Sequence, residues 1–262
     1  MEKKTESKLP AKTDRKRSAA PVDTISSLYS FPAAFASSSK KVLRSLNVFP
    51  LMSDKLFDGV KEFHSKDFIE NREIFRQLQQ EQHPHTLFIG CSDSRVVPSL
   101  ITKSLPGELF IVRNIANIVP VHNMKQMDYV ATSAVIEYAV KVLEVENIII
   151  CGHSNCGGCQ ALYYEPQRMR KLPQTRKWLS LAKSVKNSVK KKIAENPVLE
   201  SERSKMTEQL NIVQQMNHLL TYPYLRSKYQ KGQIRLMGWY YAIETGDVYN
   251  YSVEKRVFEK IS

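Results

Sequence analysis

The strongest constraint on the fold is a pair of short apolar runs that each end in metal-binding side chains. One lies within Thr86–Arg95 (TLFIGCSDSR) and delivers Cys91; the other lies within Asn147–Gly158 (NIIICGHSNCGG) and delivers His153 and Cys156. Short continuous apolar runs are typical of strands buried on both faces of a parallel sheet. Because the carboxyl ends of neighbouring parallel strands meet at one edge, the two motifs are expected to lie together there.

Apolar periodicity in the rest of the chain predicts helices between and around such strands. A further apolar strand is predicted over Glu108–Arg113, and Gln126–Leu143 has apolar residues at helical spacing. The other predicted elements are helices at Asp54–His64, Asp67–Glu81, around Val97–Lys103, through 166–205 and at Met206–Leu220, and strands at Gln233–Ile243 and Val248–Val253. The last two strands are joined by a hairpin turn signal, Glu244–Asp247.

These elements predict an α/β fold. It is a single domain with a mostly parallel central sheet flanked by helices, an N-terminal helical arm and C-terminal antiparallel edge strands. We expect the domain to cover residues 51–262. Residues 1–50 are predicted to form a basic, largely disordered N-terminal extension, because they combine Lys, Arg, Ser, Ala and Pro with little periodicity.

The net charge of +13 is concentrated in two segments. Residues 1–50 hold 10 Lys and Arg against 4 Asp and Glu, and residues 166–206 hold 12 against 3, which leaves −2 for the rest. Trp178 is the one aromatic residue in the second segment. Nucleic-acid surfaces interleave basic residues with stacking aromatics, so this pattern argues against nucleic acid as a partner and favours a solvated basic face.

Composition also bears on the compartment. No run approaches the roughly 18–20 apolar residues that span a bilayer, so no membrane span is expected. The first 50 residues match neither a secretory signal, because a long polar stretch precedes the weakly apolar run, nor a transit peptide, because they contain acidic residues. All four cysteines lie in or beside the two motifs, which fits a reducing compartment. A cytoplasmic location is predicted, with an organellar or exported protein as the alternative.

Cys91, His153 and Cys156 form a ligand set typical of zinc. Three protein ligands with an open fourth position are characteristic of catalytic zinc, and the spacing H-x-x-C lets one loop supply two donors. One alternative is a set of packed core residues. Another is a redox pair, since Cys156 and Cys159 are spaced C-x-x-C. The two motifs together favour a site for one Zn²⁺ per chain.

Asp93 and Arg95 follow Cys91 on the same predicted loop. A carboxylate there could be a fourth zinc ligand, or it could pair with Arg95 and accept a hydrogen bond from a zinc-bound water. It could also form a plain loop ion pair. The residue types alone leave these three choices open.

Both motifs resemble the zinc loops of the β-class carbonic anhydrases. The segments CSDSR at 91–95 and GHSNCGG at 152–158 are similar to the family in sequence and in separation. Supporting matches are RNIAN at 113–117, IEYA at 136–139, LTYP at 220–223 and GWY at 238–240. The resemblance covers about residues 54–255, whereas the basic stretch 166–206 is more idiosyncratic.

The resemblance implies a zinc lyase, a carbonate dehydratase. The expected reaction is the reversible hydration of carbon dioxide to bicarbonate and a proton by a zinc-bound hydroxide, which the Asp93–Arg95 dyad orients. By resemblance, the metal ligands are Cys91, His153 and Cys156, with Asp93 as a ligand only in a closed form. Further site residues implied by the resemblance are Gln82 as a substrate hydrogen-bond donor and Phe110, Ile115 and Tyr138 as pocket walls.

The resemblance also implies a homodimer or a dimer-of-dimers tetramer with the active site at a subunit interface. Members with an allosteric bicarbonate pocket carry Trp three residues before the first zinc Cys, where this chain has Phe88. An open, water-bound zinc form is therefore expected at neutral to alkaline pH. Two alternatives remain: a relative that hydrolyses another small molecule such as carbon disulfide, and a non-catalytic zinc protein that serves as an interaction platform.

Overall fold

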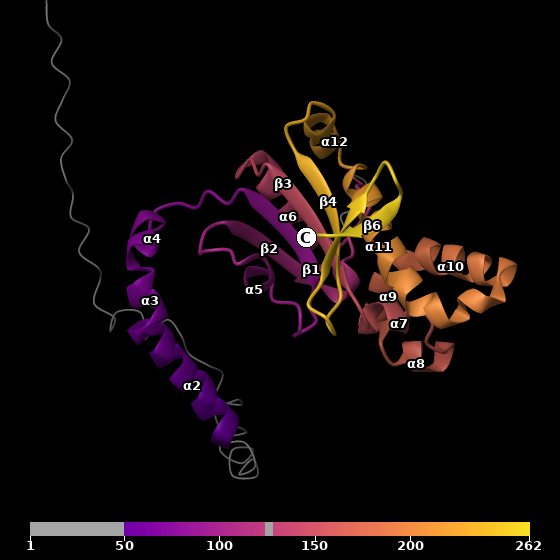
Figure 1. The fold of residues 1–262 in the computed structure, drawn as a ribbon, viewed down its shortest axis with the longest axis horizontal. Coiled ribbons are helices and arrows are strands. Elements are labelled where there is room, and N and C mark those ends of the chain that lie inside the picture. Colours follow the sequence, from indigo (N-terminus) through magenta and orange to yellow (C-terminus); the bar gives the residue numbers. More distant parts are fainter. Residues whose placement is uncertain (1–49, 124–127) are drawn as a thin grey trace, which may run out of the picture. The chain divides into compact units, whose positions relative to one another are not determined.

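The computed structural model describes residues 50–123 and 128–262 (Figure 1). The chain separates into two compact units, Met1–Glu70 and Asn71–Ser262. The predicted extension, residues 1–50, lies almost entirely outside the described residues. The predicted domain of residues 51–262 includes parts of both units, and its N-terminal limit stays a prediction.

The described part of the first unit is helical. Helix α2 spans Pro50–Ser65 and confirms the helix predicted from Asp54. The helix predicted over Asp67–Glu81 is wrong in extent, because the chain forms two short helices, α3 (Asp67–Glu70) at the end of the first unit and α4 (Arg72–Gln77) at the start of the second. They are separated by Asn71, whose φ of −101° and ψ of 14° are not helical. Asn favours such a break because its side chain competes for backbone hydrogen bonds.

The second unit is built on one mixed sheet. Among the described residues the strand order is β2-β1-β3-β4-β5-β6. The strands are β1 (Thr86–Cys91), β2 (Leu109–Asn114), β3 (Asn147–His153), β4 (Arg235–Tyr241), β5 (Val248–Ser252) and β6 (Val257–Lys260). Strands β1 to β4 run parallel to one another, β5 pairs antiparallel with β4, and β6 pairs antiparallel with β5. The predicted fold class is confirmed, although the four-residue β6 was not predicted.

Strands β1 and β3 are the buried centre of the sheet. Every residue of β1 is buried, as are the last six residues of β3. Leu87 and Ile89 point into one apolar cluster and Phe88 into another, as alternation along a strand requires. Strand β3 extends beyond the apolar run of residues 147–151 by two residues, Gly152 and His153.

Helices connect and cover these strands, and Figure 1 shows α8, α9 and α10 grouped on one side of this unit. They are α5 (Pro98–Thr102), α6 (Val130–Lys141), α7 (Gly157–Ala161), α8 (Pro166–Arg170), α9 (Pro173–Leu179), α10 (Lys183–Glu195), α11 (Arg203–Leu219) and α12 (Pro223–Gln230), with short 3-10 helices η3 (Ile115–Asn117), η4 (Ser180–Ala182) and η5 (Pro197–Glu202). None of the helices in the described residues is long and apolar enough to cross a membrane.

Helices α6 and α12 differ from prediction, and the helical stretch predicted over 166–205 is divided into α8, α9, η4, α10 and η5. Helix α6 begins at Val130 instead of Gln126, because Tyr129 has a left-handed φ of 61° that a helix does not accommodate. The first two residues of the predicted helix, 126 and 127, lie outside the described residues. Helix α12 was not predicted: Pro223 occupies its first turn, where a missing N–H costs nothing, so the proline starts a helix as well as ending the previous one.

The buried face of α11 does not follow apolar periodicity throughout. Leu210, Val213, Met216 and Leu219 share helical spacing, but only Met216 and Leu219 are buried, whereas Leu210 and Val213 are half-buried. Buried positions on this helix instead include four polar side chains, Glu208, Asn211, Gln215 and His218. Apolar periodicity could not reveal them, because their partners are backbone groups of loops far away in the sequence.

Helix α11 packs closely on the sheet at Gly238. A Cβ atom at this position would lie 2.5 Å from Met216 Sδ and 2.9 Å from Ile212 Cγ2. We expect Gly238→Ala to lower the free energy of unfolding by about 1–3 kcal/mol, the usual cost of overpacking. Denaturant unfolding measures this, with Gly157→Ala as control, because a Cβ there would contact nothing within 4 Å. Equal stability of the two variants would contradict the tight packing.

Candidate metal centre

The ends of β1 and β3 bring three potential metal ligands together. Cys91 is the last residue of β1, His153 is the last residue of β3, and Cys156 follows as the N-cap of α7. Their ligand atoms all lie within 4.8 Å of one another. The Sγ atoms of Cys91 and Cys156 are 4.0 Å apart. All three residues are buried, so water does not compete freely for these atoms.

The imidazole of His153 is oriented for binding through Nε2. Nδ1 lies 2.9 Å from the carbonyl oxygen of Ser154, so Nδ1 carries the hydrogen and donates it. Nε2 is buried and has no hydrogen-bond partner among the described residues. Leaving a buried polar atom unsatisfied costs about 1–3 kcal/mol. A metal ion between the imidazole and the two thiols would satisfy this atom, so the residues fit such an ion.

The thiols hold their protons tightly when no cation is bound. The mutual hydrogen bond with Cys156 and burial raise the pKa of Cys91 to about 12. The pKa of Cys156 is also raised to about 12, mainly by a hydrogen bond with Cys159 and by burial. Because metals bind thiolates, metal binding at this site must release protons.

Asp93 and Arg95 form a bidentate ion pair at the open side of the ligand cluster. Arg95 donates from Nε to Asp93 Oδ1 at 2.8 Å and from Nη2 to Oδ2 at 2.7 Å. These bonds hold the pKa of Asp93 well below its ordinary value, so the carboxylate is ionised. Its Oδ2 lies 3.8 Å from His153 Nε2. The carboxylate therefore lies beside the ligand cluster without being hydrogen-bonded to it.

The comparison with known families agrees with this arrangement. The family model described as carbonic anhydrase matches residues 86–248, which include both motifs. The chain belongs to the carbonic anhydrase family. It is an enzyme of the lyase class, and its fold relatives place it among the β-carbonic anhydrases.

Relatives of this carbonic anhydrase match most of its length. The carbonic anhydrase of Helicobacter pylori (strain 26695) is 39% identical over 212 residues, covering 79% of this chain and 94% of that protein. The solved β-carbonic anhydrase CcaA has a TM-score of 0.74 and 36% identity, covering 80% of this chain and 99% of that chain. A tetrameric β-carbonic anhydrase from Sordaria macrospora has a TM-score of 0.60 and 30% identity, covering 79% of this chain and 96% of that chain.

One predicted pocket residue lies beside the ligand cluster. Ile115 is 43% exposed and lines a cavity of about 440 Å³ together with Ser92, the residue after Cys91. Trp178 of α9 lines the same cavity and donates from Nε1 to the Ile115 carbonyl oxygen at 2.8 Å. Ile115 is thereby held at the open side of this carbonic anhydrase's candidate site.

The remaining predicted site residues lie elsewhere in the same chain. Phe110 pairs with Leu87, near the amino end of β1, and its ring centroid lies 5.9 Å from that of Tyr138. Gln82 is exposed and precedes β1. Because each strand residue advances about 3.3 Å, the amino end of β1 lies about 16 Å from Cys91. Within one chain, these three side chains do not meet the ligand cluster.

Three residues with roles at the site were not singled out from the sequence. Arg113 donates from Nε to the Cys91 carbonyl oxygen at 2.9 Å and from Nη2 to the Asp93 carbonyl oxygen. Trp178 holds Ile115, as described above. Glu208 accepts a hydrogen bond from the backbone N–H of Cys156, and burial raises its pKa. The only sequence signal for Arg113 was its place in the RNIAN match; the other two had none.

The Asp93–Arg95 pair makes a prediction about pH. Because the pKa of Asp93 is lowered in the folded protein, the pair stabilises the fold above the unfolded pKa of about 3.9. This contribution is lost as the pH falls toward the lowered pKa. Arg95→Ala should therefore lower the free energy of unfolding most at neutral pH, with the difference from wild type shrinking below about pH 3.9.

Denaturant unfolding at a series of pH values measures this difference. Arg226→Ala is a suitable control, because Arg226 is exposed and has no bond to the Asp93 loop. A wild-type-minus-variant difference that does not change with pH would contradict the assigned ion pair.

Proposed function

We propose that this carbonic anhydrase reversibly hydrates carbon dioxide to bicarbonate and a proton at one Zn²⁺ held by Cys91, His153 and Cys156. The observation that carries the proposal is the buried triangle of two thiols and an imidazole whose Nε2 has no hydrogen-bond partner among the described residues. Two sulfurs and one nitrogen suit zinc, and three protein ligands leave a position for catalysis. A zinc ion there would supply Lewis acidity, which lowers the pKa of water from about 15.7 toward about 7.

The Asp93–Arg95 dyad would orient the attacking water. Both carboxylate oxygens of Asp93 accept hydrogen bonds from Arg95, which fixes the plane of the carboxylate. Because the lowered pKa keeps Asp93 ionised, it remains a hydrogen-bond acceptor over the working pH range. Asp93 would accept a hydrogen bond from the O–H of the water. This contact would turn a lone pair of the water oxygen toward carbon dioxide. Ile115 would form one wall of the substrate pocket.

We propose that the site is open at neutral to alkaline pH. Asp93 could reach a metal only by giving up at least part of its bidentate pairing with Arg95, which is a strong charge-assisted contact. By resemblance, members with the allosteric pocket carry a Trp at the position of Phe88. Phe88 is fully buried and packs edge-on against Trp239, with 6.4 Å between the ring centroids. An apolar ring there offers bicarbonate no hydrogen-bond donor.

A second copy of the chain would complete the site. Gln82, Phe110 and Tyr138 lie at the other end of β1 and β2 from Cys91, and β2 is an edge strand of the sheet. Tyr138 is 45% exposed and Ile111 of β2 is 39% exposed. Exposed apolar side chains beside an unpaired edge strand favour association. We propose a homodimer in which each copy supplies these three residues to the other's zinc, with a dimer-of-dimers tetramer as its extension.

The compartment is part of the same proposal. The four cysteines are all free thiols in the described residues. Thiols that serve as metal ligands persist in a reducing compartment. We propose a cytoplasmic protein on this ground.

Stopped-flow carbon dioxide hydration tests the reaction. We expect fast turnover by zinc-replete wild type that rises from about pH 6.5 to 9, the range in which the activated water titrates. Asp93→Asn should keep one zinc per chain and lose most turnover, because an amide cannot hold the same ionic contact with Arg95 or accept equally from the water. Wild-type protein that binds one zinc and shows no turnover at any pH would contradict the proposal.

Subunit complementation tests the shared site. We expect Cys91→Ser and Phe110→Ala chains to be nearly inactive alone and to recover activity when unfolded together and refolded. In randomly paired dimers about a quarter of the sites would then combine an intact zinc triad with an intact partner Phe110. Phe110→Ala mixed with itself is the control. Absence of recovery, with mixed dimers shown by mass, would mean that each chain builds its own site.

A further inference from the structure

We infer that Glu208 is a positioning residue that holds Cys156 in place for metal binding from the side of α11. The inference rests on the zinc site proposed above. Glu208 is only 2% exposed, yet both of its carboxylate oxygens are engaged. Oε1 accepts a hydrogen bond from the backbone N–H of Cys156 at 3.0 Å, and Oε2 accepts one from the Tyr240 hydroxyl at 3.1 Å.

The loop that carries Cys156 is held from two sides. Asn155, the preceding residue, has a left-handed φ of 55°, which Asn adopts more readily than most residues other than glycine. Arg95 Nη2 donates to the Asn155 carbonyl oxygen at 3.2 Å, on the side of the Asp93 dyad. Glu208 accepts a hydrogen bond from the next N–H along the chain, that of Cys156. The loop is therefore tied by one charged side chain at Asn155 and by another at Cys156.

Glu208 ties this loop to two rigid elements at once. It lies on α11, and its partner Tyr240 lies on β4, the strand next to β3 in the sheet. A loop fixed to a long helix and a central strand keeps the Sγ atom of Cys156 facing Cys91 and His153. Partners of this kind behind a ligand typically set the geometry and affinity of a metal site.

The chemistry along α11 distinguishes this contact from ordinary loop anchoring. Asn211 donates to the Ala116 carbonyl oxygen at 2.8 Å, and Gln215 accepts from the Val119 N–H at 2.9 Å. Neutral amides suffice for these two loop positions. A carboxylate is used where the partner is the backbone N–H of Cys156, a proposed metal ligand, and a charge-assisted hydrogen bond is roughly twice as strong as a neutral one.

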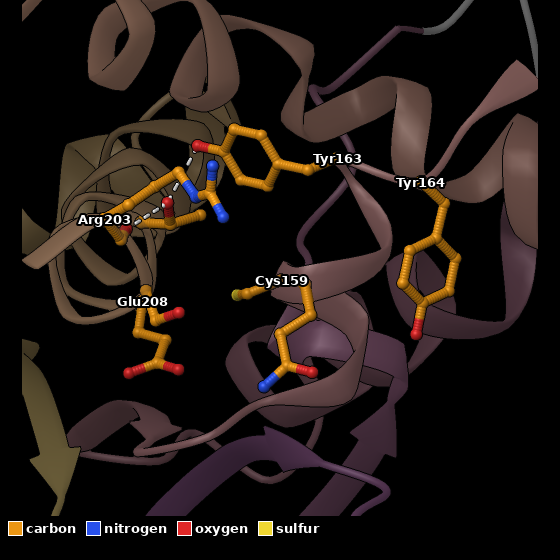
Figure 2. A pocket seen from close by; sticks show the side chains of 8 residues that line it. Cys159, Tyr163, Tyr164, Arg203 and Glu208 are labelled. Carbon is orange, nitrogen blue, oxygen red and sulfur yellow. Dashed lines mark hydrogen bonds between the residues drawn. The ribbon is translucent and has the colours of Figure 1, made fainter. Parts of the chain in front are cut away.

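A cavity leads to Glu208 without passing the ligand cluster. Glu208 lines a cavity of about 330 Å³ together with Cys159, Tyr163 and Arg203, and Figure 2 shows these side chains around it. None of Cys91, His153 and Cys156 lines this cavity. A small carboxylate could thus enter the space that Glu208→Ala would leave, without passing through the active site.

Zinc affinity of the full chain, measured by competition with a chromogenic chelator, tests the inference. We expect Glu208→Ala to bind zinc about 10–100-fold more weakly than wild type, the usual effect of losing a group that orients a ligand. The ligand-field spectrum of the cobalt-substituted protein should change in parallel. Glu208→Gln keeps an acceptor oxygen for the Cys156 N–H, so it should lose less affinity than Glu208→Ala.

Gln215→Ala is the matched control, because Gln215 is fully buried on the same helix and anchors a loop that carries no ligand. We expect it to lower stability and to leave zinc affinity unchanged. Added formate should partly restore zinc affinity in Glu208→Ala and in neither Gln215→Ala nor wild type. Glu208→Asp, which keeps the charge but is one methylene too short to reach Cys156, serves if Glu208→Ala does not fold, and it should also bind zinc more weakly.

Two results would overturn the inference. Wild-type zinc affinity in Glu208→Ala or Glu208→Asp would remove the positioning role. Equal losses of affinity in the Glu208 variants and in Gln215→Ala, with no rescue by formate, would reduce it to general stabilisation. Wild-type protein that binds no zinc at all would instead contradict the proposed function, so the two failures are distinguishable.

Discussion

The parallel pairing of β1 with β3 is the constraint on which the rest of the structure depends. Gly90 lies opposite Cys151, so Cys91 ends β1 close to the last residues of β3, which include His153. A shift of one residue would turn the side chains of one strand to the opposite face and separate the two motifs. The register is secured by burial, because apolar residues of both strands pack on both faces of the sheet. The ligand cluster of Cys91, His153 and Cys156 is thus positioned by the apolar core.

The ligand cluster could be predicted from the sequence because each of its signals is local. A short apolar run with a Cys or His at its end shows both the strand and the chemistry that the strand delivers, as at Cys91 and His153. The same locality made α5 and the β4–β5 hairpin predictable. The predicted substrate contact Gln82 and the predicted pocket residues Phe110 and Tyr138 came only from a family resemblance, since nothing in their own surroundings marks them.

The errors arise where the decisive partner is distant in sequence. Helix α6 begins only after Tyr129, whose hydroxyl donates to the Lys177 carbonyl oxygen and whose ring packs on Trp178, about fifty residues away. The buried face of α11 carries polar as well as apolar residues, because Glu208, Asn211 and Gln215 bond the backbone of loops 52 to 96 residues earlier. A periodicity test scores such residues as solvent-facing, although each satisfies a buried backbone group that would otherwise be costly.

These long-range bonds give the two sides of the metal centre different characters. On the α11 side, buried side chains tie the ligand loop and η3 to the helix, and Ala116 and Asn117 are held in left-handed conformations by the same packing. On the other side, Asp93, Arg95 and Ile115 remain partly exposed, and Arg113 of β2 donates to the Asp93 carbonyl oxygen. The loop that carries Cys156 is thus held from both sides, by Glu208 of α11 at the Cys156 N–H and by Arg95 at the Asn155 carbonyl oxygen. The buried polar side chains of α11 therefore position the loops around the ligand cluster, and Glu208 alone among them bonds a ligand residue.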